Sequence, residues 1–241
     1  MAKKNNKKTI HHILIMDASG SMKSITDVTI RGVNSQIEGI LAEDSDKVNQ
    51  LVSIIRFNTQ VYKDFIDVAP KNLPKVTSET YAPDGSTALY DAVGLIVNEY
   101  KTKLKNALDT KVFINIFTDG EENASTEYTK EQIALLLHQV QTDLGWVVTY
   151  VGANQDVSSV AKGLNIPLGN AMSYSADHVG TLLAFQTMSS SRMQYTRSVG
   201  EGHAINTCAM YSSTGQPLDL TFPDKTKLLT EDIYDKSLPT E

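Results

Sequence analysis

Cysteine is nearly absent from the sequence, and the one that occurs, Cys208, has no second thiol with which to pair. A single cysteine excludes an intramolecular disulfide and a zinc site built from several cysteines. Basic residues are in the minority, since 22 Lys and Arg face 28 Asp and Glu and leave a formal net charge of −6. This balance argues against a nucleic-acid partner, because binding to phosphates needs a basic surface.

Long apolar runs are also missing. No stretch approaches the ~20 apolar residues of a membrane-spanning helix, so we expect no membrane segment. Lysines within residues 1–9 precede the apolar run 13–16, but Asp17 ends that run after four residues. A secretory signal needs roughly seven to fifteen apolar residues in this place. We therefore expect residues 1–9 to be a basic tail and the protein to be cytoplasmic, which a lone thiol also fits.

What the sequence does contain is an alternation of strand-like and helix-like segments. Short apolar runs such as 11–17 and 112–117 are typical of buried parallel strands. Residues 89–104 instead place their apolar side chains on one face of a helix. The expected strands are 11–17, 50–57, 61–68, 112–117, 146–151 and 171–174, and the expected helical segments are 33–41, 89–104, 133–144, 156–163 and 176–195.

This alternation predicts a three-layer, Rossmann-like α/β domain over residues 10–197, with a mostly parallel central sheet flanked by helices. After about residue 198 the apolar pattern thins, and residues 223–241 carry charged and polar side chains without periodicity. We expect residues 198–241 to be an irregular C-terminal extension that is loosely ordered or that depends on a partner for its order.

Polar side chains gather where expected strands end or a helix begins. Asp17, Ser19 and Ser21 alternate along the loop after the first strand, so they can project to one side. Asp119 comes just after a later apolar strand, and Thr87 comes just before the long helix. Because ligands of open α/β sheets bind beyond the carboxyl ends of the strands, we expect these side chains to meet there.

The chemistry of these side chains indicates the kind of ligand. They are carboxylates and hydroxyls, which are hard oxygen donors, and no histidine or thiol is among them. Such donors favour Mg²⁺, with Mn²⁺ or Ca²⁺ as alternatives, over zinc or copper. A pair of carboxylates roughly cancels the charge of a divalent cation. Neutral hydroxyls then leave the metal able to accept an anionic oxygen from outside.

The segments DASGS, GSTALYDA and FTDG resemble, in order and spacing, the metal-ion-dependent adhesion site (MIDAS) of von Willebrand factor A (vWA) domains. The resemblance covers roughly residues 10–195 and is to a stand-alone intracellular, prokaryotic or phage type. It implies that Ser19, Ser21 and Thr87 are hydroxyl ligands of the metal. It also implies that Asp17 and Asp119 bind the metal directly or through water.

The same resemblance implies a binding function, in which an Asp or Glu of a partner protein completes the coordination of the metal. Family members inside cells often serve as adaptors, some of them beside AAA+ ATPases. The resemblance therefore predicts a magnesium-dependent adaptor, with an AAA+ ATPase or another assembly component as a candidate partner.

Other functions remain open at this point. One is a structural subunit of a larger assembly, such as a phage particle, in which residues 198–241 would be ordered. Another is a metal-dependent hydrolase, but the chain has neither a P-loop (GxxxxGK[ST]) nor a GxSxG nucleophile motif. Ser19 also stands where a phosphoaspartyl hydrolase would need its second carboxylate. We therefore expect a binding module and not an enzyme.

The roles of several polar residues near these segments are less defined. Asn34 could bond the metal-site loop or face solvent. The pattern favours a solvated loop for Glu121 and Glu122, although they could also rim the site. It favours an exposed first helical turn for Asp91 and a turn for Asp84.

Overall fold

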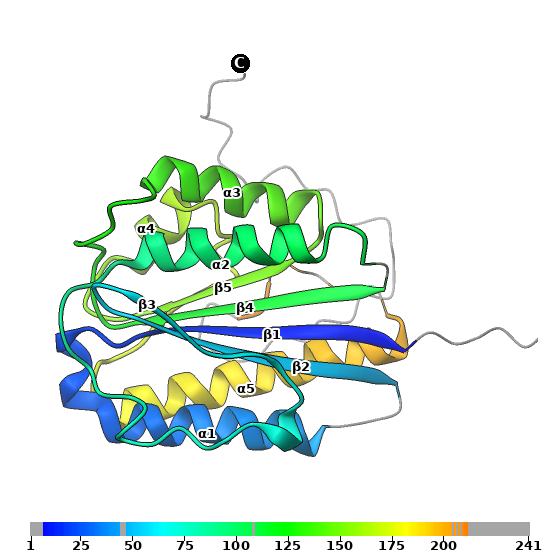
Figure 1. Cartoon of the computed structure of the whole chain (residues 1–241), viewed down its shortest axis with the longest axis horizontal. Helices are drawn as coiled ribbons and strands as arrows, with labels where there is room; N and C mark the ends of the chain where they lie inside the picture. Colours follow the sequence, from blue (N-terminus) through cyan, green and yellow to red (C-terminus); the bar gives the residue numbers. More distant parts are fainter. Residues whose placement is uncertain are drawn as a thin grey trace, which may run out of the picture.

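The computed structural model describes residues 7–43, 47–107, 109–203, 205, 207 and 209–211, which form a sheet with helices on both faces (Figure 1). The strand order is β3-β2-β1-β4-β5-β6, and all neighbouring strands are parallel except β2 and β3, which are antiparallel. The strands are β1 Lys8–Asp17, β2 Val48–Phe57, β3 Val61–Val68, β4 Thr110–Thr118, β5 Val147–Gly152 and β6 Ala171–Ser173.

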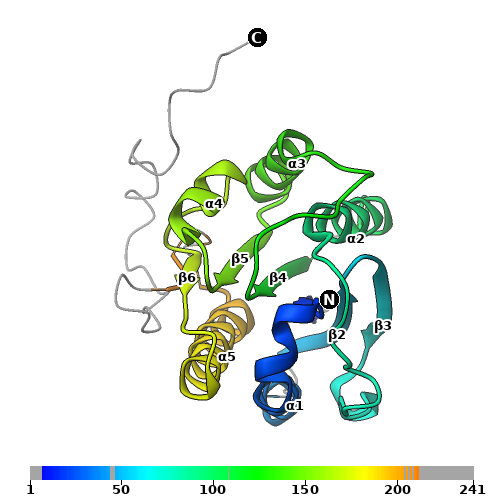
Figure 2. The same ribbon diagram turned by 90° about the vertical axis from the view of Figure 1, so that its left-hand side faces the viewer.

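Helices α2, α3 and α4 cover one face of the sheet, and α1 and α5 cover the other (Figure 2). The expected three-layer, Rossmann-like α/β fold is therefore confirmed. The helices are η1 Gly20–Ile25, α1 Thr26–Ala42, η2 Pro70–Asn72, α2 Leu89–Lys103, α3 Lys130–Thr142, α4 Val157–Gly163 and α5 His178–Glu201.

Strand β1 lies at the centre of the sheet, and its apolar residues pack against the helices on both faces. Ile10 and Leu14 belong to the core beneath α1 and α5, whereas Ile13 and Ile15 belong to the core beneath α2 and α3. Because successive side chains of a strand point to opposite faces, a strand covered on both sides must be apolar throughout. This requirement explains the continuous apolar run at residues 13–16.

Helix α5 is longer than the expected 176–195. It begins at His178, where the side chain of Asp177 accepts a hydrogen bond from the Gly180 amide, and it ends at Gly202 with φ 73°. Glycine adopts this left-handed conformation readily and is a common helix terminator. Residues 1–6 and 212–241, which belong to the expected terminal extensions, lie outside the described residues.

Helices α1 and α5 are held together by close packing and by a buried cation. A Cβ on Gly32 would lie 2.2 Å from the Phe185 ring, so only glycine permits this approach. The buried guanidinium of Arg192 donates hydrogen bonds of 2.9 and 3.0 Å to the carboxylate of Glu43. Burial, together with the charge of Arg192, lowers the pKa of His12 to about 3. His12 is therefore neutral, and Arg192 has Glu43 as its counter-ion.

Within the described ranges, no helix is both long enough and apolar enough to cross a lipid bilayer.

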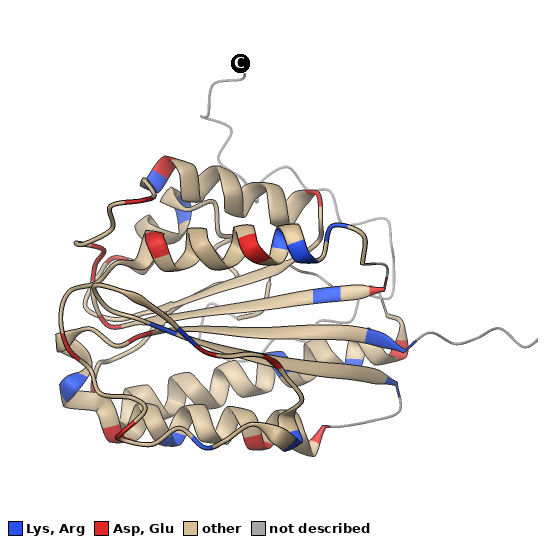
Figure 3. Ribbon diagram, viewed as in Figure 1, with Lys and Arg blue, Asp and Glu red and all other residues tan. Residues whose placement is uncertain are grey.

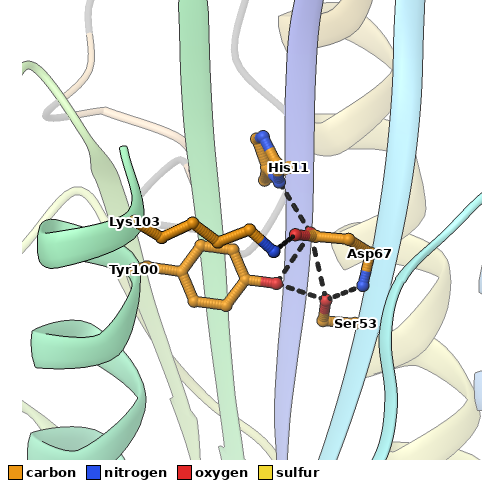
Figure 4. Close-up of polar contacts among 5 residues, drawn as sticks. All are labelled: His11, Ser53, Asp67, Tyr100 and Lys103. Atoms are coloured by element: carbon orange, nitrogen blue, oxygen red, sulfur yellow. Dashed lines mark hydrogen bonds and ion pairs between the residues drawn. The ribbon is translucent and has the colours of Figure 1, made fainter. Parts of the chain in front are cut away.

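On the face of the sheet that α2 covers, the carboxylate of Asp67 links β3 to β1, β2 and α2 (Figure 4). Asp67 Oδ1 accepts hydrogen bonds of 2.7 Å from both His11 Nδ1 and the Tyr100 hydroxyl, and Lys103 donates to Oδ2. Ser53 Oγ accepts a hydrogen bond of 2.8 Å from the Asp67 amide. Asp67 itself has φ 51°, a conformation that a non-glycine residue keeps only when its surroundings enforce it. These contacts anchor the edge strand β3 to the rest of the domain.

Burial alone would raise the pKa of Asp67, but the hydrogen bonds from His11, Lys103 and Tyr100 outweigh it and hold the pKa well below its usual value. A lowered pKa in the folded state means that the unfolded chain binds the proton first as the pH falls. The stabilising effect of Asp67 is therefore fully present above the unfolded pKa, near 4, and is lost as the pH falls through the folded pKa.

We predict that Asp67→Asn lowers the free energy of unfolding by roughly 1.5–3 kcal/mol at neutral pH, because hydrogen bonds to a charged acceptor are lost. Urea denaturation of both proteins at several pH values measures the difference, which should shrink below about pH 4. Asp84→Asn is the control, since Asp84 is an exposed partner of Lys23 and should matter little. A difference that is independent of pH would contradict this account.

Candidate metal centre

The candidate centre lies at the carboxyl ends of β1 and β4, on the edge that faces the viewer in Figure 2. Met16 pairs with Phe117 across these strands, and this register places Asp17 beside Thr118. The loops that follow the strands carry the other side chains. Neighbouring parallel strands therefore bring together segments that are about a hundred residues apart in the sequence.

The structure brings all five predicted residues to one place. Ser21 Oγ donates a hydrogen bond of 2.6 Å to Asp119 Oδ1 and lies 3.1 Å from Ser19 Oγ. The amide of Ser19 donates to Asp17 Oδ1 at 2.7 Å. A Cβ on Gly120 would lie 3.6 Å from Ser21 Oγ and 3.8 Å from Thr87 Oγ1, so Thr87 belongs to the same cluster. Their role as metal ligands stays a prediction.

The two carboxylates of the cluster are withdrawn from water. Asp17 is 0% exposed and Asp119 is 2% exposed, whereas Ser21 is exposed. Burial raises the pKa of both carboxyl groups. For Asp17 the charge of Asp119 acts in the same direction, and hydrogen bonds from Thr118 and Ser19 offset part of the effect. A divalent cation would relieve this repulsion, so the donor set fits such an ion in charge as well as in chemistry.

The segment before α2 carries Thr87 into the cluster by crossing the end of β1. Asp84 donates its amide to the carbonyl of Ala18 at 2.8 Å, and Gly20 donates to the carbonyl of Gly85 at 3.0 Å. The Tyr81 hydroxyl donates to the carbonyl of Asp17 at 2.6 Å. Burial and the nearby Asp17 charge raise the pKa of Tyr81, so this hydroxyl keeps its proton. These bonds fix the position of Thr87 relative to Asp17.

Asn34 supports the same segment from α1. Its side-chain nitrogen donates to the carbonyl of Val76 and its oxygen accepts from the Val76 amide, both at 2.9 Å. Asn34 thus bonds neither of the metal-site loops directly, but the earlier part of the segment between η2 and α2.

Thr118 is a buried residue of this centre that the sequence motifs do not indicate. Its hydroxyl donates to Asp17 Oδ2 at 2.6 Å and accepts a bond of 3.2 Å from the Gly120 amide. It therefore orients Asp17 and the turn after Asp119 at the same time. The only signal for it in the sequence is its place between a buried strand and Asp119.

Amide side chains that the sequence analysis also missed hold the turn that contains Asp119. Asn154 Nδ2 donates to the carbonyl of Asp119, and Gln155 Nε2 donates to the carbonyl of Gly120, both at 3.0 Å. Asn123 Oδ1 accepts a bond of 2.9 Å from the amide of Thr87. These residues lie far from the motif segments or outside their pattern, so nothing in the sequence singles them out.

The expectation for Glu122 was wrong, and Asp91, which does lie in the first turn of α2, is only half exposed. Glu122 is not a solvated loop residue, because its carboxylate accepts hydrogen bonds from the amides of Tyr90, Ala124 and Ser125. Asp91 is not simply exposed on α2, because it accepts three bonds of 2.9 Å from consecutive amides, those of residues 126–128. Both carboxylates bind the loop after Asp119 to the first turn of α2.

Glu121 matches the expectation of a solvated loop residue, whereas Asp84 lies in an irregular segment and not in a turn. Glu121 is exposed, and Asp84 is an exposed residue of the segment before α2 that pairs with Lys23 at 3.2 Å.

Over the described part of the chain, no group of three or more His, Cys, Asp or Glu residues could hold a metal ion. The candidate centre differs from such groups because most of its donors are hydroxyls. Few anionic ligands leave charge on the metal for a further anion. The arrangement is therefore chemically suited to reversible binding of a carboxylate supplied by another molecule.

No family model matches the sequence, and no curated protein matches it. Several solved structures do match in fold. The PilB minor pilin from Streptococcus sanguinis aligns at TM-score 0.53 and 14% identity, over 78% of this chain and 62% of that one. Proximal thread matrix protein 1 from the mussel byssus, with a zinc-occupied MIDAS motif, aligns at TM-score 0.54 and 12% identity, over 76% of this chain and 45% of that one.

A von Willebrand factor type A protein from Catenulispora acidiphila aligns at TM-score 0.53 and 13% identity, over 78% of this chain and 43% of that one. In all three cases this chain spans less than two thirds of the matched protein. Identities this low carry the fold alone. The strand order, the helix layers and these likenesses together show that the chain has the von Willebrand factor A fold.

Proposed function

We propose that this protein is a metal-dependent protein-interaction module, in which Asp17, Ser19, Ser21, Thr87 and Asp119 hold a divalent cation, with Mg²⁺ as the first candidate. The observation that carries the proposal is the convergence of two buried carboxylates and three hydroxyls at one edge of the sheet. Buried like charges without a compensating ion are costly. A cation with hard-ligand preference supplies that compensation.

The partner that fits this centre is a protein that presents an Asp or Glu side chain. Ser21 is exposed, so the cluster is open toward solvent on that side. A partner carboxylate can therefore reach the metal, whereas Asp17 and Asp119 are already engaged by Thr118 and Ser21. Because both carboxylates already accept hydrogen bonds, we favour a binding function over a catalytic one. The protein would then act as an adaptor, and an AAA+ ATPase or another assembly component is a candidate partner.

A second candidate function is a structural subunit of a larger assembly. The proteins of similar fold include a minor pilin and a thread matrix protein of the mussel byssus. Both likenesses are compatible with a fold that serves as a building block. In that case the metal would stabilise the subunit, and association would not require a free coordination position.

We predict that Mg²⁺ stabilises the protein through this centre. At a metal concentration of about 100 times Kd, binding adds about 2.7 kcal/mol of stability and raises Tm by roughly 5–11 °C. Differential scanning calorimetry with Mg²⁺ and with EDTA measures the shift. Asp119→Asn should abolish it, and Asp143→Asn, which removes an exposed carboxylate at the end of α3, should retain it. An equal shift in both variants would place the metal elsewhere.

We predict that Thr118→Val weakens metal binding by about 10–100-fold, since groups that orient a ligand usually matter to this extent. Valine keeps the shape of threonine but removes the hydroxyl that fixes Asp17 Oδ2. Isothermal titration with Mg²⁺ or Mn²⁺ gives the affinity. Thr142→Val, at the exposed end of α3, is the matched control. Unchanged affinity in Thr118→Val would mean that Asp17 does not depend on this bond.

We predict that partner capture requires both the metal and Asp119. Purified protein immobilised on a resin is incubated with extract of its source, in Mg²⁺ and in EDTA. A partner retained by the wild type and by Asp143→Asn in Mg²⁺, but lost in EDTA and in Asp119→Asn, supports the adaptor function. A partner that remains bound in EDTA excludes coordination of its carboxylate and favours the structural subunit.

A further inference from the structure

A second polar region lies at the opposite edge of the sheet from the candidate metal centre. A pocket of about 280 Å³ opens there between the first residues of β1 and β4 and the last turn of α5. Figure 3 shows basic residues at the right-hand ends of the central strands, where this pocket lies. The described residues that line it include no acid. They are Lys8, Lys111, Gly145, Tyr195, Val199, His203, Ile205 and Thr207.

The two lysines give this pocket an excess of positive charge. Lys8 and Lys111 lie on neighbouring strands, and the register that pairs Ile10 with Lys111 directs both toward the α5 side of the sheet. Lys8 Nζ donates a hydrogen bond of 3.2 Å to the carbonyl of Val199, which has no formal charge. Among the described residues, no carboxylate forms an ion pair with either lysine. His203, another basic side chain of the pocket, has an acidic partner, because its Nδ1 lies 3.3 Å from Glu201 Oε2.

Tyr195, which lines the same pocket, has a buried hydroxyl without a hydrogen-bond partner among the described residues. Tyr195 is 1% exposed, and within the described structure its hydroxyl bonds to nothing. The Phe113 ring packs against the Tyr195 ring at a centroid distance of 5.0 Å and limits its movement. Buried polar groups are nearly always satisfied, by protein, by water or by a ligand. Within the described ranges, the pocket thus combines a hydroxyl donor that lacks an acceptor with two lysines that have no acidic partner.

We propose that this pocket binds a small oxyanion of the phosphate class. Such an anion offers several acceptor oxygens and can take hydrogen bonds from both ammonium groups and from the Tyr195 hydroxyl together. The opening at Gly145, where nothing lies within 4 Å of a Cβ position, gives access from solvent. Inorganic phosphate and the phosphate of a larger phosphomonoester both fit, because they present the same kind of oxygens to the pocket.

Isothermal titration of the full chain with inorganic phosphate tests this proposal, in EDTA and at constant ionic strength. The wild type should show saturable binding. Lys111→Met should weaken it at least about tenfold, because a charge-assisted hydrogen bond is lost. Lys105→Met removes an exposed lysine that does not line the pocket and should bind as the wild type does. No saturable heat, or equal binding by Lys111→Met, would overturn the proposal.

Tyr195→Phe keeps the buried ring and removes only the hydroxyl, so it serves if Lys111→Met fails to fold. It should bind phosphate about fivefold more weakly without loss of thermal stability. Unchanged affinity in this variant would overturn the assignment of the hydroxyl.

Titration with methyl phosphate distinguishes inorganic phosphate from a phosphomonoester as the ligand, since tight binding of methyl phosphate indicates a phosphomonoester. Acetate that binds as well as phosphate would overturn the phosphate class. Asp119→Asn should bind phosphate normally, which separates this site from the metal centre.

Discussion

The burial of the Asp17 and Asp119 carboxylates in one cluster is the constraint around which one edge of the domain is built. Both lie at the ends of neighbouring parallel strands, and burial raises the pKa of each. Thr118 and Ser21 satisfy part of their hydrogen-bonding capacity. What hydrogen bonds cannot supply is positive charge. An external cation therefore has a place that the polypeptide itself leaves open.

The fold could be predicted from sequence because its main determinants are local. The apolar run of β1 follows from burial on both faces, and the stripe of α2 follows from burial on one. The cluster of Asp17, Ser19 and Ser21 could likewise be predicted, since alternation along a loop fixes which side chains share a side. The position of Thr87 in the cluster required knowledge that its loop crosses the end of β1, which the resemblance supplied and the bonds of Ala18 and Gly85 explain.

The supporting residues could not be predicted, for a physical reason. Asn154 and Gln155 follow β5, and their side chains bond the carbonyls of the turn after β4. Only the pairing of β4 with β5 makes these two loops neighbours. Glu122 was taken for a solvated residue because an acid in a loop is usually solvated. Its partners include the Tyr90 amide, which is distant in the sequence and comes near only when α2 packs beside the loop. A sequence pattern shows which side chains an element carries. It does not show which backbone amides of a neighbouring segment need a hydrogen-bond acceptor.

The bonds of Glu122 and Asp91 have a consequence for the segment between Gly120 and α3. It contains no helix or strand, yet three of its amides donate to Asp91 in the first turn of α2, and its own Glu122 accepts from the Tyr90 amide. A protease must draw several residues into an extended conformation before it can cut. Here that would require the simultaneous loss of all these bonds, and α2 would lose its first-turn contacts with them. In proteolysis this loop should therefore behave as part of the helix.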